Sequence, residues 1–187
     1  MLTIKHYKIS DSTLKGIKMV FVGDFHIKPN QSQRLNKVIN LINEQQPDIV
    51  LSVGDFVNGH KENMTMPISN IAEQLKNVKT KYGFYTVLGN HDWWIDGKGI
   101  TDTLTGNGIK VLVNSNKKIN INGKKVYIVG VEDITTRTPD IYSALNGANN
   151  PMCIIRCKNN RSYFICIKPN NDKRIGVRNN RIRYRKN

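Results

Sequence analysis

Three short polar clusters contain residue types that bind metal ions, and each cluster follows a run of apolar residues. The clusters are Asp24-Phe25-His26 after residues 18–23, Gly54-Asp55 after residues 49–53, and Gly89-Asn90-His91-Asp92 after residues 86–88. Carboxylate, amide and imidazole groups are all donors that hold divalent cations in proteins. Two such cations about 3.5–4 Å apart can stabilise the attacking and leaving oxygens of a phosphoryl transfer. The clusters therefore indicate metal-dependent chemistry on a phosphate ester.

The donors suggest distinct roles within one site. Asp24 and His26 are two residues apart, so in an extended segment a carboxylate and an imidazole face the same side. Asp55 could bridge two cations with its two oxygens, and Asn90 would add a neutral amide oxygen. Asp and Asn are also common in ordinary turns, so each cluster taken singly is a weak signal. The three clusters in order, each at a strand end, predict a metal site.

His91 and Asp92 are candidates for proton handling. His91 would lie beside a metal ligand, where it could protonate a leaving alkoxide or stabilise phosphoryl oxygens. Asp92 could orient its ring, as carboxylates next to metal sites do for histidine. Nearby, His60 is expected to be a solvated loop residue. Trp93 and Trp94 could form either a wall for substrate or part of the core.

The segments between the clusters predict an α/β fold with a mostly parallel sheet. Apolar residues recur at helical spacing in residues 31–46 and 67–80, whereas residues 18–23, 48–53 and 83–88 are short and apolar, as buried strands are. Strand, helix, strand, helix, strand at this spacing gives two right-handed βαβ units. Because ligands bind beyond the carboxyl ends of such strands, the three polar clusters should meet there.

The rest of the first 150 residues predicts flanking elements. Residues 2–9 alternate like an edge strand, and residues 98–106 are predicted to form a short helix. Strands are expected at residues 109–113, 118–121 and 125–131, with a turn at Asn122-Gly123 that predicts an antiparallel hairpin extension.

These motifs resemble those of the calcineurin-like metallophosphoesterase family. Asp24-Phe25-His26 matches its D-x-H block, Gly54-Asp55 with the residues after it the G-D block, and Gly89-Asn90-His91-Asp92 the G-N-H-D block. The likeness covers about residues 1–150, including Gly130-Val131-Glu132-Asp133. Within the family, the chain is most similar to the branch that includes pyrophosphatases of lipid-linked nucleotide sugars.

The resemblance implies a site and a reaction. Asp24 and His26 would bind a first metal, Asp55 would bridge, Asn90 would bind a second metal, and His91 with Asp92 would handle protons. Family members use Mn, Fe or Zn, and they hydrolyse phosphoester or pyrophosphate bonds with a metal-bound hydroxide. The expected substrate is therefore a small or lipid-linked phosphate ester.

The chain departs from the family pattern downstream. Further histidine blocks complete the family site, but the four histidines here are His6, His26, His60 and His91. The first metal would keep three protein ligands and the second only two, so we expect impaired activity and one metal rather than two. The β-sandwich of the family is expected to be incomplete, with apolar surface left uncovered.

The composition changes abruptly at residue 151. Residues 151–187 contain 11 Lys and Arg, one acidic residue and all three Cys, whereas residues 1–150 hold 18 basic and 13 acidic residues. We therefore predict a phosphoesterase-like, truncated domain at 1–150 and a basic tail at 151–187, solvated and adding little stability. A change of reading frame in the coding sequence would produce such a break.

The basic tail leaves two other functions open: an inactive remnant, or a protein that binds nucleic acid or a membrane surface through its charge. The tail lacks regularly interleaved aromatic residues, so specific nucleic-acid binding is not expected. No apolar run approaches the ~20 residues that span a bilayer, and no secretory leader is evident. A cytoplasmic location is expected, with peripheral membrane contact left open.

Overall fold

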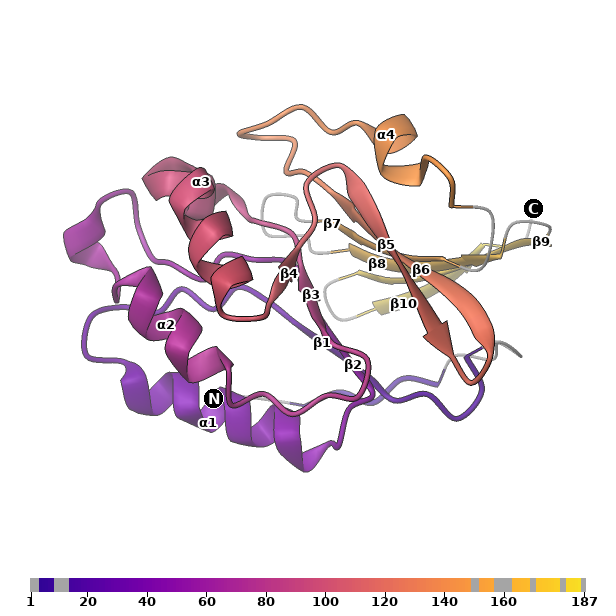
Figure 1. Ribbon diagram of the computed structural model, residues 1–187, viewed down its shortest axis with the longest axis horizontal. Helices are drawn as coiled ribbons and strands as arrows, with labels where there is room; N and C mark the ends of the chain where they lie inside the picture. Colours follow the sequence, from indigo (N-terminus) through magenta and orange to yellow (C-terminus); the bar gives the residue numbers. More distant parts are fainter. Residues whose placement is uncertain are drawn as a thin grey trace.

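Two β-sheets packed face to face form the centre of the molecule, with helices on both outer sides (Figure 1). The computed structural model describes residues 4–8 and 14–148, together with the strands at residues 152–156, 163–168, 171–178 and 181–185. The first sheet contains β1 (Met19–Val22), β2 (Ile49–Ser52), β3 (Phe84–Thr86) and β4 (Lys110–Val111). The second contains β5 (Ser115–Ile121), β6 (Lys124–Val131), β7 (Met152–Arg156), β8 (Tyr163–Lys168), β9 (Asn171–Arg178) and β10 (Arg181–Arg185). The helices are α1 (Ser32–Glu44), α2 (Ile68–Leu75), α3 (Asn90–Gly106) and α4 (Ile141–Leu145), with a 3₁₀ turn η1 (Glu62–Met64).

The predicted parallel sheet is confirmed. Its order is β1-β2-β3-β4, and each neighbouring pair is parallel, with Met19 opposite Ile49 and Val50 opposite Phe84. The predicted third strand at residues 83–88 is shorter, and the strand predicted at 109–113 is reduced to β4 on the edge of this sheet. All four strands point the same way, so the segments after β1, β2 and β3 leave one edge together.

Helices α1, α2 and α3 cover one face of the first sheet (Figure 1). Leu35 and Ile39 of α1 and Leu75 of α2 are buried, as the helical spacing predicted. Helix α2 ends at Leu75 rather than at residue 80, and just after this end the Asn77 carbonyl accepts a hydrogen bond from Asn43 Nδ2 at 2.9 Å. That bond ties the end of α2 to α1.

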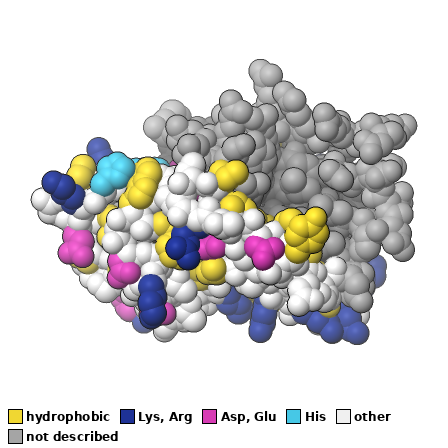
Figure 2. Space-filling model, turned by 90° about the horizontal axis from the view of Figure 1, so that it is seen from above, with side chains coloured by type: hydrophobic (Ala, Val, Ile, Leu, Met, Phe, Trp, Pro, Cys, Tyr) yellow, Lys and Arg dark blue, Asp and Glu magenta, His cyan; other side chains and the backbone are white. Residues whose placement is uncertain are grey.

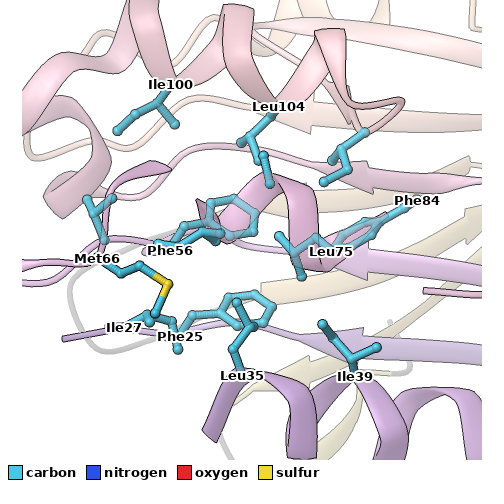
Figure 3. Packing of buried hydrophobic residues seen from close by; sticks show 14 of the residues in the cluster. Phe25, Ile27, Leu35, Ile39, Phe56, Met66, Leu75, Phe84, Ile100 and Leu104 are labelled. Atoms are coloured by element: carbon cyan, nitrogen blue, oxygen red, sulfur yellow. The ribbon is translucent and has the colours of Figure 1, made fainter. Parts of the chain in front are cut away.

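The residues after β1 and β2 are anchored by this core. Phe25 and Phe56, which directly follow Asp24 and Asp55, stack with ring centroids 5.0 Å apart. Figure 3 shows both rings within the cluster that also includes Leu35, Met66 and Ile100. In the clusters after β1 and β2, a site residue is therefore followed by a buried phenylalanine that fixes its loop.

The second sheet covers the other face of the first sheet. Leu51 and Tyr85 of the first sheet are buried in one cluster with Ile121 and Ile128 of the hairpin. The expectation of a largely uncovered apolar face is therefore wrong, because the β5–β6 hairpin starts a second layer instead of only extending the first. The hairpin itself is confirmed: Asn122 and Gly123 both have positive φ, 51° and 80°, as a type I′ turn requires.

The strands beyond residue 151 continue the second sheet. Strand β7 runs parallel to β6, and β8, β9 and β10 follow as antiparallel neighbours. The Ile155 side chain is buried in the same cluster as Ile121 and Ile128. The expectation that the tail is solvated is therefore wrong at β7, because this strand pairs with the edge of β6 and its Ile155 side chain is buried in the apolar core. The change of reading frame stays a prediction.

Two further expectations differ from the structure. Residues 4–8 form no strand, because alternation gives a strand only where a neighbouring edge accepts its hydrogen bonds; the remainder of the segment 2–9 lies outside the described residues. The helix expected at 98–106 is present, but α3 starts earlier, at Asn90, and has non-helical backbone angles at Asp96. The G-N-H-D cluster thus forms the first turn of a helix.

Among the residues described, no helix is both long and apolar enough to cross a membrane.

Candidate metal centre

Three of the predicted metal ligands converge beyond the carboxyl ends of β1 and β2. Asp24, His26 and Asp55 each offer a ligand atom, and these atoms lie within 4.8 Å of one another. Asp24 is exposed, His26 is partly buried and Asp55 is buried. Two carboxylates and one imidazole at this separation could hold a divalent cation that remains open to solvent on the Asp24 side.

The backbone at these three residues is strained. Asp24, His26 and Asp55 have positive φ values of 54°, 42° and 54°. Non-glycine residues rarely adopt this left-handed conformation, which costs of order 1–3 kcal/mol at each position. Such strain gathers at functional sites, and of the seven described non-glycine residues with positive φ, three are the residues whose donors converge.

Hydrogen bonds between the two strand-end loops hold this conformation. The Asp24 N–H donates to the Gly54 carbonyl at 3.2 Å, and the His26 N–H donates to the Asp55 carbonyl at 2.8 Å. Ile27 continues the pairing with an N–H bond to the Phe56 carbonyl at 3.1 Å. The loops therefore run side by side past the strand ends, which brings the Asp24 and Asp55 carboxylates to one place.

The Asp55 carboxylate lies at the start of α3. Its Oδ1 accepts a hydrogen bond from the His91 N–H at 3.0 Å. Burial raises the pKa of Asp55 above its usual value, while the His91 N–H and the nearby His26 and His91 rings oppose the rise, and Asp24 adds to it. A cation bound between Asp24 and Asp55 would favour the ionised forms of both.

Asp92 is fully buried, and its carboxylate accepts hydrogen bonds from backbone N–H groups. Its Oδ2 accepts N–H bonds from Asp55 at 2.8 Å and Gly89 at 3.0 Å, and its Oδ1 accepts from Phe56 at 2.9 Å and Val57 at 3.2 Å. The side chain thus joins the loop after β2 to the start of α3. Burial, and then the Asp55 charge, raise the pKa of Asp92 to about 7 against the opposing effect of these N–H bonds.

The geometry corrects the role that the sequence suggested for Asp92. The His91 Nδ1 lies 3.0 Å from the Gly59 carbonyl oxygen, and both Asp92 oxygens are engaged by backbone N–H groups. The His91 ring is therefore oriented by Gly59, not by Asp92. Sequence spacing could not reveal this, because the carbonyl that meets His91 Nδ1 belongs to Gly59, 32 residues away in the chain.

His91 lies next to His26 and Asp55, and Asn90 precedes it at the start of α3. The His91 and His26 rings meet edge to face with centroids 4.5 Å apart. Asn90 is buried and is the first residue of α3, one position before the N–H that binds Asp55. The first turn of α3 thus places both residues beside Asp55.

Two glycines permit the close approach of these segments. A Cβ atom on Gly89 would lie 2.2 Å from Asp55 Oδ1, and a Cβ atom on Gly54 would lie 2.4 Å from the Gly89 nitrogen. No side chain fits at either position. The glycines of the G-D and G-N-H-D clusters are therefore required by the packing of the site itself.

His60 is the residue near the site that sequence reasoning placed in solvent. It is exposed, but its ring centroid lies 4.3 Å from that of Trp94 and 5.6 Å from that of His91. Trp94 in turn lies 4.8 Å from His91. The signal available in the sequence was its position five residues after Asp55, on the loop that leaves the same strand end.

The chain belongs to the calcineurin-like phosphoesterase family, whose model matches residues 17–159. It is 28% identical over 155 residues to a zebrafish (Danio rerio) transmembrane protein with a metallophosphoesterase domain, covering 76% of this chain and 35% of that protein. It is 27% identical over 139 residues to an uncharacterised metallophosphoesterase of Bacillus subtilis, covering 73% and 50% of the two chains.

Among solved structures, an archaeal phosphodiesterase is similar with a TM-score of 0.41 and 12% identity, covering 87% of this chain and 99% of that one. The chain spans half or less of the length of the curated relatives named above. The α/β architecture, with its parallel sheet and strand-end site, agrees with membership of this family.

Proposed function

We propose that this chain hydrolyses a phosphoester or pyrophosphate bond at a divalent metal held by Asp24, His26 and Asp55, with Asn90 as a further ligand. The observation that carries the proposal is the convergence of the three donors within 4.8 Å on strained strand-end loops. Mixed carboxylate and imidazole donors suit Mn, Fe or Zn. When bound, such a metal polarises a phosphoryl oxygen and lowers the pKa of water.

The side chains of the site hold one another in position, and His91 is the group proposed to transfer a proton. The Gly59 carbonyl can only accept a hydrogen bond, so the His91 Nδ1 beside it carries the proton. Nε2 is then the nitrogen that would give a proton to the leaving oxygen or donate to a phosphoryl oxygen, and it can do so when the ring is the imidazolium with both nitrogens protonated. Asp92 holds the backbone of both loops, so that His91 and Asp55 keep their relative place.

The ligand set favours one well-held metal. Asp24, His26 and Asp55 form one three-donor group, whereas a second metal would rely on Asp55 and Asn90 among the residues proposed here. We therefore propose that the first position binds more tightly than the second. A small phosphodiester and a lipid-linked diphosphate both fall within the proposed substrate class.

The test is hydrolysis by the full chain loaded with Mn²⁺. We expect turnover of bis(p-nitrophenyl) phosphate or p-nitrophenyl phosphate that is lost with EDTA and restored by Mn²⁺. The variant Asp55→Asn should be inactive, while Asp102→Asn, on the exposed side of α3 in an ion pair with Lys98, should retain activity. Tight Mn²⁺ binding without turnover of either ester would instead support a non-enzymatic remnant.

A further inference from the structure

An exposed group of aromatic rings continues directly from the candidate metal centre. From His26 the rings follow in the order His91, Trp94 and His60, with successive centroids 4.5, 4.8 and 4.3 Å apart. The Trp94 side chain is 44% exposed and His60 is also exposed. Figure 2 shows histidine and hydrophobic side chains side by side on the surface at one end of the described part.

The loop that carries His60 is held in place by its own contacts. The Asn58 N–H donates to Thr65 Oγ1 at 3.0 Å, and Asn58 Nδ2 donates to the Met64 carbonyl at 3.1 Å. Thr65 Oγ1 in turn donates to the Ile27 carbonyl at 2.9 Å, and the Gly59 carbonyl meets His91 Nδ1. His60 is therefore presented to Trp94 from a loop fixed at both ends.

We infer that His60 and Trp94 form a subsite for a planar aromatic group on the organic side of the phosphate ester. This inference rests on the proposed function. A phosphate placed at Asp24, His26 and Asp55 would lie next to His91, and its ester group would extend past His91 to the exposed rings. Flat rings bind such groups by stacking.

The alternative is that Trp94 only packs against its neighbours. Trp93, the preceding residue, shows that behaviour: its ring packs against the first core cluster and lies 4.4 Å from the Arg137 guanidinium. Trp94 faces the two histidines and solvent instead, so its exposed surface is next to the site.

The experiment compares three phosphonates, which contain no ester bond to hydrolyse: phenylphosphonate, cyclohexylphosphonate and methylphosphonate. Binding to the Mn²⁺-loaded full chain is measured by calorimetry. We expect phenylphosphonate to bind roughly three- to tenfold more tightly than the other two. Trp94→Ala should remove this preference without changing the affinity for methylphosphonate, Trp94→Phe should keep most of it, and His60→Ala should reduce it.

Tyr142→Ala provides the matched control, because Tyr142 is an 88% exposed aromatic residue on α4 that should not affect binding. Equal affinity for phenyl- and cyclohexylphosphonate would overturn the inference, as would a Trp94→Ala variant that weakens all three ligands equally. In both cases methylphosphonate still binds and the proposed function stands. If no phosphonate binds the metal-loaded chain, the proposed function fails and the inference fails with it.

Discussion

The backbone N–H of His91 donates a hydrogen bond to Asp55 Oδ1 at 3.0 Å, which joins the start of α3 to the carboxylate at the end of β2. One residue supplies the imidazole and also fixes the carboxylate through its main chain. The N-terminal end of a helix carries partial positive charge, so this position favours the ionised carboxylate. The position of α3 and the charge of the proposed metal ligand Asp55 are thereby linked at one contact.

Asp55→Asn should weaken Mn²⁺ binding by at least about tenfold, because it removes one of two carboxylate charges facing the cation. The amide oxygen can still accept the His91 N–H, so the fold should be retained. Calorimetric titration with Mn²⁺ measures the loss, and circular dichroism checks the fold. An unchanged affinity would show that the metal lies elsewhere; Asp102→Asn serves as the control for lost charge.

Asp92→Ala should lower the free energy of unfolding by about 3 kcal/mol or more, because four backbone N–H groups lose their acceptor and each unsatisfied buried group costs ~1–3 kcal/mol. Asp92→Asn, which keeps one acceptor oxygen, should lose less. Urea denaturation gives both values. If Asp92→Ala keeps full stability but loses only catalysis, Asp92 acts on the reaction and not on the backbone.

His91→Ala should reduce kcat on esters with poor leaving groups by ~10²–10⁴-fold, the usual contribution of general acid catalysis. The effect on p-nitrophenyl esters should be far smaller, since p-nitrophenolate leaves without a proton. Paired kcat measurements on p-nitrophenyl and alkyl esters test this. Equal losses on both substrates would assign His91 an electrostatic or structural role.

Ile155→Ala should destabilise the fold by about 2–4 kcal/mol, the usual cost of removing a buried Ile side chain. Ile155 packs with Ile121 and Ile128 between the sheets. Thermal and urea unfolding of the full chain provide the measurement, with the exposed Ile134→Ala as a matched control. Equal stability of the two variants would mean that β7 adds nothing to the second layer.

Ionisation of the Tyr85 phenol should lower the free energy of unfolding in alkaline solution. Burial raises its pKa to about 12, while in the unfolded chain the pKa is close to 10. The folded state holds the phenol proton more tightly, so stability is fully present below pH 10 and is lost as the pH rises toward 12. Ultraviolet titration should show one late phenol that is absent in Tyr85→Phe, and this variant should lose less stability between pH 9 and 11. An early titration of all tyrosines would contradict the prediction.

Local pattern in the sequence was sufficient for helix α1, for the positions of β1 to β3, for the β5–β6 hairpin and for the order of the site clusters. Apolar spacing placed Leu35 and Ile39 on the buried face of α1, and Asn122-Gly123 specified the hairpin turn, because both signals depend on residues close in the chain. The polar clusters after β1, β2 and β3 indicated a metal site because parallel strands end at one edge.

Tertiary structure decided the contacts between segments far apart in the chain. The left-handed backbone of Asp24 and Asp55, the four N–H groups at Asp92 and the bond from His91 Nδ1 to the Gly59 carbonyl all depend on which segments meet in space. The same holds for the burial of Ile155 and for His60 next to Trp94. Periodicity specifies which face of an element is apolar, but not which partner covers that face or completes its hydrogen bonds.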